Sequence, residues 1–300
     1  MLVFLAAAAA VAPFLLRGYP LYVASEVALY ALAAVALDVL AGYAGLVSLG
    51  QAAFFGIGAY AAAIVSAHAG PNIALTLAVG FAAAALFGAL TAPLALRSAG
   101  IFFLMITLAF AQLVWATADK WHSLTGGSDG FVIAKLSLSD TAFYGVCLGL
   151  LVLTTLLLAQ LLRSPAGRAL DAVRQNELRA RSVGLAAFWY KYWAFVLASG
   201  ITGIAGVLHA HHRNFASLAD LSWTNSVLFL VMVLLGGLRS LWGAVIGAAV
   251  FVVLQTWISS KTDRWENFVI GIVLIAIVLL TRRGLWSLIH PAQPLTRTQT

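Results

Sequence analysis

Long apolar runs separated by short polar segments occupy most of the 300-residue chain. A helix that crosses a bilayer needs about 20 apolar residues, and runs of roughly this length recur along the whole sequence. The candidate membrane spans are approximately 2–16, 21–41, 46–67, 73–96, 100–118, 142–162, 185–208, 223–237, 241–259 and 266–281. The pattern predicts an all-α polytopic membrane protein with about 8–10 transmembrane helices in a single transmembrane domain, residues 1–300.

The composition agrees with this fold class. Hydrophobic residues make up 63% of the chain and charged residues only 9%, against about 25% charged in soluble domains. The net charge of +7 can indicate nucleic acid, but the basic residues lie between the apolar runs, which is typical of membrane topology. We therefore expect lipid, and no nucleic acid, as a partner. The single cysteine, Cys147, lies in an apolar run and is expected to be a packed thiol.

The distribution of basic residues predicts the orientation. If the N-terminus is cytoplasmic and ten spans follow, eleven of the seventeen Lys and Arg residues lie on the cytoplasmic side. This excess follows the positive-inside rule and places the C-terminus in the cytoplasm. The run 2–16 lacks the basic segment that precedes the apolar part of a signal peptide, so we expect a retained first helix.

The longest cytoplasmic loop, residues 163–184, is polar but has a helical pattern. Ser164 and Pro165 suit the start of a helix, and Gly184 suits its end. At 100° per residue, five positions fall within one arc of about 80°, namely Leu170, Val173, Glu177, Ala180 and Gly184. Small residues and a carboxylate fit a groove on a protein better than a lipid surface. The loop is therefore predicted to be one amphipathic helix that docks on a partner, with a helix lying on the bilayer as the alternative.

The third apolar run is rich in glycine, and part of it recurs later in the chain. Its first half and the preceding turn contain Gly42, Gly45, Gly50, Gly56 and Gly58. Such density indicates either close packing of helices or a broken helix that lines a cavity. Residues 45–52 match 237–244 at five of eight positions, which is either a parallel internal repeat or chance similarity in a biased composition.

Ionisable residues inside apolar runs cost about 2.5–3.5 kcal/mol each at the centre of a span, so they are candidates for function. Glu26 and Asp38 both lie in the second run. We expect Glu26, near the outer end, to reach water. Asp38, near the cytoplasmic end, is expected to reach the interface or to pair with Arg97. Gln51 is expected to form a hydrogen bond with another helix, with a contact to a ligand as the alternative.

The outer loop, about residues 119–141, contains the segment LTGGSDG at 124–130. Its glycines and its Thr, Ser and Asp side chains suit a tight, hydrogen-bonded turn. This turn is either an ordinary surface feature or part of the outer mouth of a path through the membrane.

Several patterns that resemble sites carry no chemistry. His209, His211 and His212 have no spaced Cys or acidic ligands, so they predict a solvated outer loop and no metal site. The G-x-G-x-x-A pattern at 56–61 imitates a dinucleotide fingerprint but lies within an apolar run. The sequence contains no phosphate-binding G-x-x-x-x-G-K-[ST] motif and no nucleophile, base and orienter set. We therefore expect no enzymatic activity and no cofactor bound by this chain.

Seven segments resemble, in the same order, the LivM-type permeases for branched-chain amino acids. They are 42–45 (GYAG), 48–60 (SLGQAAFFGIGAY), 124–130 (LTGGSDG), 167–184 (GRALDAVRQNELRARSVG), 190–195 (YKYWAF), 203–206 (GIAG) and 235–243 (LGGLRSLWG). Glu177, Ala180 and Gly184 occupy the E-x-x-A-x-x-x-G core of the family's cytoplasmic loop. Two departures are visible, because Asp38 stands where the family more often has Asn, and Arg239 stands where Gly is frequent.

The resemblance implies a permease subunit of an ATP-binding-cassette (ABC) importer for branched-chain amino acids in the bacterial inner membrane. It implies a second, usually different permease subunit, two ABC ATPase subunits that bind ATP and Mg, and a periplasmic or surface substrate-binding protein. The implied ATPase-coupling residues are Arg168, Asp171, Arg174, Glu177, Ala180, Arg181 and Gly184. Candidates for the translocation path are Asp38, Ser48, Gln51, Phe54 and Tyr60, and those of the outer loop are Thr125, Gly126, Gly127 and Asp129.

Two alternatives for the function remain open. Permeases of the same type carry urea, short amides or other small organic acids, and the binding protein makes much of that selection. A protein of another class, an ion-coupled secondary transporter, needs a titratable relay near the bilayer midplane. The central parts of most apolar runs contain no ionisable residue, which favours the ABC permease.

Overall fold

The computed structural model describes residues 18–136, 138–261, 271, 285 and 286. The predicted spans 2–16 and 266–281 lie outside the described residues, apart from Gly271. The predicted cytoplasmic C-terminus also lies outside them.

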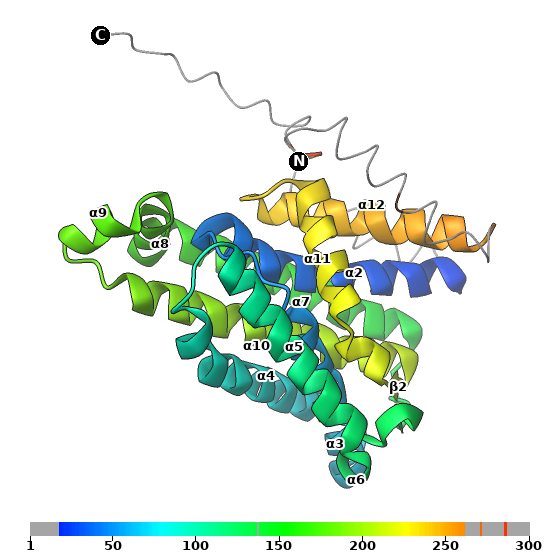
Figure 1. Cartoon of the computed structure of the whole chain (residues 1–300). Coiled ribbons are helices and arrows are strands. Elements are labelled where there is room, and N and C mark those ends of the chain that lie inside the picture. The colour runs from blue at the N-terminus through cyan, green and yellow to red at the C-terminus, as the bar shows by residue number, and fades with distance from the viewer. Residues whose placement is uncertain (1–17, 137, 262–270, 272–284, 287–300) are drawn as a thin grey trace.

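Helices make up most of the described chain, and two short strands connect distant loops (Figure 1). The helices are α2 (Tyr19–Asp38), η1 (Val39–Ala44), α3 (Gln51–Ala69), α4 (Ile73–Ala95), α5 (Ile101–Lys120), α6 (His122–Thr125), η2 (Gly127–Asp129), α7 (Asp140–Arg163), α8 (Pro165–Gln175), α9 (Glu177–Ser182), α10 (Ala187–Arg213), η3 (Leu218–Leu221), α11 (Trp223–Gly236) and α12 (Leu241–Ser259). Strand β1 (Phe131–Val132) pairs antiparallel with β2 (Phe215–Ala216).

Seven of these helices are long and apolar enough to cross a membrane. They are α2 with η1, α3, α4, α5, α7, α10 and α12, while α11 is a shorter apolar helix. A helix satisfies its own backbone hydrogen bonds, which is what a segment in hydrocarbon requires. The all-α polytopic architecture is thus confirmed, and the eight predicted spans between residues 21 and 259 each correspond to a helix.

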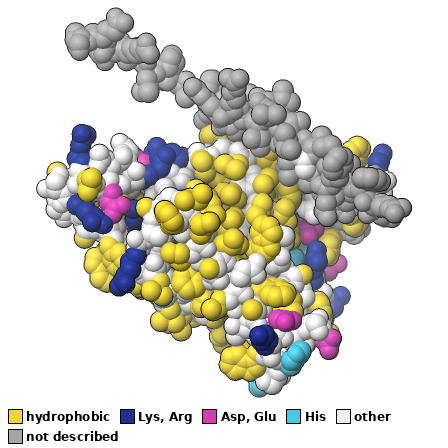
Figure 2. All heavy atoms as spheres, in the orientation of Figure 1, with side chains coloured by type: hydrophobic (Ala, Val, Ile, Leu, Met, Phe, Trp, Pro, Cys, Tyr) yellow, Lys and Arg dark blue, Asp and Glu magenta, His cyan; other side chains and the backbone are white. Residues whose placement is uncertain are grey.

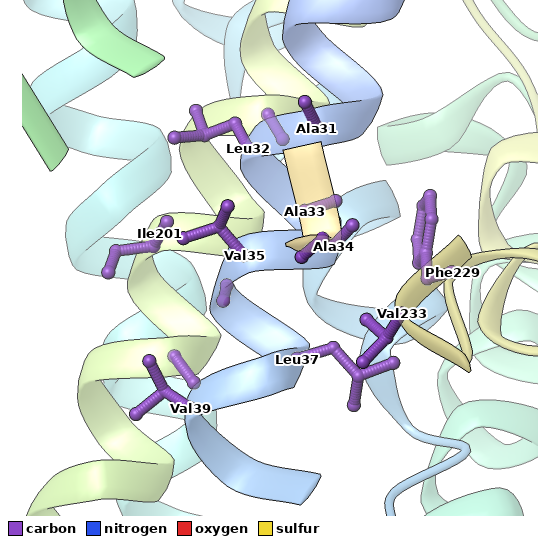
Figure 3. Packing of buried hydrophobic residues seen from close by; sticks show 14 of the residues in the cluster. Ala31, Leu32, Ala33, Ala34, Val35, Leu37, Val39, Ile201, Phe229 and Val233 are labelled. Carbon is purple, nitrogen blue, oxygen red and sulfur yellow. The ribbon is translucent and has the colours of Figure 1, made fainter. Parts of the chain in front are cut away.

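Helix α2 lies at the centre of the bundle, because every residue from Ala31 to Leu40 is buried. Figure 3 shows Ile201 of α10 beside Val35 on one side, and Phe229 and Val233 of α11 near Leu37 on the other. The run of alanines in this stretch has small side chains, which let the neighbouring helices approach closely. This stretch, apolar except for Asp38, therefore forms the core of the domain.

Helices α4, α5 and α7 lie at the periphery and expose apolar side chains. Leu90, Ile101, Phe102 and Leu157 are each more than half exposed. Figure 2 shows hydrophobic side chains over the middle of the bundle and charged side chains gathered near its two ends. A contiguous apolar surface of this kind is typical of contact with lipid or another membrane protein rather than water.

The glycine-rich third run contains both a break and a close packing surface. Residues 45–50 are not helical, and Gly45 has a φ of 72°, a conformation that glycine adopts at little cost. Within α3, a Cβ atom added to Gly58 would lie 2.0 Å from the carbonyl oxygen of Gly203 in α10. The glycines of α3 and α10 thus allow backbone-to-backbone contact between these helices.

The single cysteine is a packed core residue, as predicted. Cys147 lies on α7, is 1% exposed and belongs to the main hydrophobic cluster.

Candidate functional site

The polar loop predicted as one helix forms two helices. Asn176 separates α8 from α9 with extended backbone angles (φ −157°, ψ 101°), and its side chain accepts a hydrogen bond from the backbone N–H of Arg179 at 3.0 Å. Asparagine is among the best residues for capping the start of a helix. The prediction of one continuous helix was wrong because Asn176 starts a new helix. The apolar positions keep their helical spacing on both sides of Asn176, so the spacing alone does not reveal the break.

The apolar stripe of this loop faces the protein itself rather than a partner. Leu170, Val173 and Ala180 are at most 6% exposed, and Val173 and Ala180 pack with Ala187 at the start of α10 and with Leu185 just before it. This differs from the expectation that the stripe docks on another chain. Ala180 is therefore a packing residue in this structure. Gly184 is exposed and follows α9 with a φ of 85°.

Exposed residues of α9 and of the position after it leave an open surface around this helix. Leu178 is 81% exposed and Val183 is 72% exposed, and the basic residues Arg179 and Arg181 lie between them in sequence. We call these four residues the α9 face. Figure 1 shows α8 and α9 at one end of the bundle, beyond the ends of the long helices. Large apolar side chains so exposed on a basic helix are typical of a docking surface.

An ion-pair cluster holds α9 against α10. The carboxylate of Glu177 accepts hydrogen bonds from Lys191 Nζ and from the Arg181 guanidinium, each at 2.5 Å. The bond from Lys191 is the main cause that lowers the pKa of Glu177, and Arg181 adds to it. Because the folded-state pKa is lowered, this cluster stabilises the fold above the usual carboxyl pKa, and the contribution is lost as the pH falls through the lowered value.

A second polar cluster links α8 to the turn between α11 and α12. The guanidinium of Arg239 donates to Asp171 at 2.7 Å, and Arg174 lies 3.7 Å from the same carboxylate oxygen. The backbone N–H of Arg239 donates to the buried carboxylate of Asp38 at 2.9 Å, and its carbonyl oxygen accepts from the Tyr43 hydroxyl. Asp38 therefore pairs with this turn and not with Arg97, the partner that was expected.

The backbone of Arg239 gives a prediction about this turn. Its φ is 67°, a conformation that costs a residue with a side chain roughly 1–2 kcal/mol. Exposed ion pairs contribute only about 0–1 kcal/mol. We therefore expect Arg239→Gly to be about 1 kcal/mol more stable than Arg239→Ala, since both lose the pair with Asp171 and only glycine relieves the backbone. Thermal unfolding of the two variants in detergent checks this, and equal midpoints would contradict it.

The residues predicted to line a translocation path are buried between helices. Gln51 Oε1 accepts from the Thr202 hydroxyl of α10 at 2.7 Å, so the expected bond to another helix is present. Ser48 Oγ accepts from the backbone N–H of Gly50, and Phe54 packs edge-on against Phe195. Tyr60 is 6% exposed. These residues join α3 and the turn before it to the bundle.

The outer loop forms the expected tight turn. The Thr125 hydroxyl donates to the carbonyl oxygens of Ala118 and Trp121, and accepts from the backbone N–H of Gly127. Gly126 and Gly127 both have positive φ values, at 71° and 60°. Asp129 is exposed. The pairing of β1 with β2 then fastens this loop to the end of α10.

The three histidines lie in the last turns of α10 and not in a solvated loop, so that prediction was wrong. His209 and His211 are buried. One nitrogen of each ring has a partner that a sequence does not show, because His209 Nε2 lies 3.2 Å from Asp220 and His211 Nε2 lies 3.1 Å from the Thr76 hydroxyl. Among the described residues, no group of three His, Cys, Asp or Glu side chains is arranged to hold a metal ion.

A polar cleft of about 570 Å³ opens at the end of the bundle opposite α8 and α9. It lies between the first turns of α2, the end of α10, η3, the start of α11 and the end of α12. Its charged and aromatic groups come from Tyr19, Glu26, Tyr30, His209, Arg213 and Asp220. None of the five predicted path residues is part of its lining.

Comparison with known proteins identifies the family. The sequence matches the family described as "branched-chain amino acid transport system / permease component" over residues 19–278. The chain belongs to this family. The resemblance found in the seven sequence segments is thereby confirmed. No solved structure matches the chain.

Two kinds of curated relative are found for this branched-chain permease family member. The high-affinity branched-chain amino acid transport system permease protein LivM of Escherichia coli (strain K12) is 28% identical over 226 residues, which cover 65% of this chain and 53% of LivM. The autoinducer 2 import system permease protein LsrC of Klebsiella pneumoniae subsp. pneumoniae is 31% identical over 182 residues, covering 57% and 51%. The chain spans about half the length of the curated relatives it matches.

Sequence reasoning about this permease missed most of the polar cleft. It singled out Glu26, which it assigned to water, and His209, which it assigned to a solvated loop. Arg213, Tyr30 and Asp220 come from three separate elements, and no spacing along the chain relates them. The sequence feature that could have indicated the cleft is the group of three histidines and Arg213 at 209–213, followed by Asp220.

Proposed function

We propose that this chain is a membrane subunit of an ABC importer that carries branched-chain amino acids across the inner membrane by alternating access. The α9 face is the observation on which the proposal chiefly rests. A chain without a phosphate-binding motif presents, between two spans, a short basic helix with Leu178 exposed on it and Val183 exposed just after it. Such a helix suits a groove on an ATPase subunit, which would carry the ATP and Mg.

The connections of α8 and α9 support a coupling role. Glu177 and Lys191 join α9 to α10, and Asp171 and Arg239 join α8 to the turn before α12. Movement of a docked ATPase would therefore reach two of the long helices as rigid-body displacement. Arg168, Arg174 and Arg181 add positive charge around the contact.

The rest of the assembly is part of the same proposal. A second permease subunit, a different homologous chain, completes the path, two ATPase subunits drive it, and a periplasmic or surface binding protein delivers the amino acid. The multi-pass chain lies in the bacterial inner membrane with its C-terminus in the cytoplasm. Thr125, Gly126, Gly127 and Asp129 form a rigid turn suited to contact with the binding protein.

The experiment is affinity purification of the tagged chain from mild detergent with identification of the proteins that accompany it. We expect ATPase subunits to co-purify with the wild type and to be lost with Leu178→Glu plus Val183→Glu, because the charges oppose docking of an apolar face. Val132→Glu is the matched control, since this apolar residue is 78% exposed on β1. A chain that purifies alone and takes up substrate in ATP-free vesicles would instead be an ion-coupled secondary transporter.

A further inference from the structure

The polar cleft contains two acid–base pairs, Asp220 with His209 and Glu26 with Arg213, that differ in their hydrogen bonding and their exposure. Asp220 accepts from the backbone N–H of Ser217 at 2.8 Å with one oxygen, while the other lies 3.2 Å from His209. Both side chains are less than 10% exposed. This inner pair is thus held by the capping of η3 and forms a fixed part of the wall.

The outer pair is loose and accessible. The guanidinium of Arg213 lies 3.6 Å from the Glu26 carboxylate, which is longer than a good charge-assisted hydrogen bond. The Arg213 side chain is 52% exposed, and that of Glu26 is 16% exposed. A small ligand can therefore reach both groups from the cleft without displacing a packed side chain.

The cleft also has an apolar part. Leu228 and Met232 of α11 and Val252 of α12 belong to its lining beside the charged groups. Gln255 and Thr256 add amide and hydroxyl groups on the same wall as Val252. A ligand that fits this arrangement has a compact head with both charges and an aliphatic side chain.

We propose that the polar cleft is a binding site for the zwitterionic head of an aliphatic α-amino acid, with Arg213 on its carboxylate and Glu26 on its ammonium. The inference rests on the proposed function, since it assumes that the imported solute is an amino acid. Net charge is conserved, because a neutral pair accepts a neutral zwitterion. Arg213 offers the planar donor pair that a carboxylate binds in a bidentate manner.

The chemistry of the cleft discriminates among possible solutes. Urea and short amides carry no charge for an acid and a base to bind. An organic acid has a carboxylate that Glu26 would repel. The other titratable groups near the pair are Tyr19, Tyr22, Tyr30, His209, His212 and Asp220. The close approach of Asp220 to His209 leaves Glu26 as the accessible carboxylate acceptor for an ammonium group.

Leucine binding to the purified importer, with its ATPase subunits but without the binding protein, tests this site. We expect Arg213→Gln and Glu26→Gln to weaken leucine binding by about tenfold or more, since each removes a charge-assisted hydrogen bond. In the wild type, leucine amide and 4-methylpentanoate, which each lack one charge, should bind as weakly as leucine binds to the variants. Lys120→Gln, at the same end of the bundle but outside the cleft, is the control and should bind leucine like the wild type.

The outcomes separate the site from the function. Variants that assemble with their ATPase subunits, remain monodisperse and bind leucine as the wild type does would overturn the site while leaving amino acid import intact. A wild-type assembly that shows no ATP-driven leucine uptake in the presence of its binding protein would overturn the proposed function, and the site with it. If Arg213→Gln does not assemble, Glu26→Gln and the two leucine analogues still decide the question.

Discussion

Replacing Glu177 with Lys is expected to lower ATP-driven uptake by about tenfold or more while the chain still inserts in the membrane, because hydrogen bonds to charged groups contribute about 1.5–3 kcal/mol. The substitution places a third cation beside Lys191 and Arg181, so α9 loses its attachment to the start of α10. The apolar stripe below it, with Val173 and Ala180, is unchanged and keeps α8 and α9 folded on the bundle. Uptake by the reconstituted importer is the measurement.

Two further variants show whether charge pairing is the cause. Glu177→Gln keeps the size of the side chain and one acceptor oxygen, so we expect uptake between that of the wild type and that of Glu177→Lys. Combining Glu177→Lys with Lys191→Glu restores a pair of opposite charges between the two helices and should recover uptake. Wild-type uptake in a correctly assembled Glu177→Lys importer would rule out an essential coupling role for this carboxylate.

Replacing Gly206 with Val is expected to prevent formation of a stable permease. A Cβ atom added there would lie 1.8 Å from the carbonyl oxygen of Phe55 and 2.7 Å from its carbonyl carbon. Both atoms belong to the backbone of α3, so α3 and α10 must move apart. Overpacking in a core costs about 1–3 kcal/mol and occasionally more, and we expect the upper end because no flexible side chain can yield.

The matched control for this substitution lies on α7. Gly149 is also in the middle of a membrane helix, but a Cβ atom added there meets no atom within 4 Å. Gly149→Val should therefore give the wild-type yield of monodisperse protein in size-exclusion chromatography, whereas Gly206→Val should give aggregate or none. Equal elution profiles for the two variants would show that close contact between α3 and α10 is not needed for the fold.

The membrane helices could be predicted from the sequence because each one is a long apolar run bounded by polar residues. The largest errors at a boundary were five residues, at the start of α3, predicted at residue 46 and found at Gln51, and at the end of α10, predicted at residue 208 and found at Arg213. Histidine is counted as polar in such a prediction, but His209 and His211 are buried because Asp220 and Thr76 offer partners. Those partners come from other elements, so a local pattern does not contain them.

The loop at 163–184 and the polar cleft were less predictable, again because their residues contact partners from distant elements. The apolar stripe in residues 163–184 was found correctly as a pattern, but periodicity does not tell which surface a stripe packs against. The break at Asn176 had a local signal, an asparagine followed by Glu177, which a continuous helical pattern concealed. The pairs formed by Asp38 with Arg239 and by Glu26 with Arg213 join residues about 200 positions apart and require the fold.

Because Cys147 is buried, we expect that cysteines for site-specific labelling can be introduced without first removing it. Thiol reagents act on accessible thiolates, and the only cysteine of this sequence lies 1% exposed within α7. Cysteines introduced at Leu178 and at Asp129, both exposed and at opposite ends of the bundle, would therefore carry spin or fluorescent probes alone. The separation of the two ends could then be followed through a nucleotide cycle without altering the core.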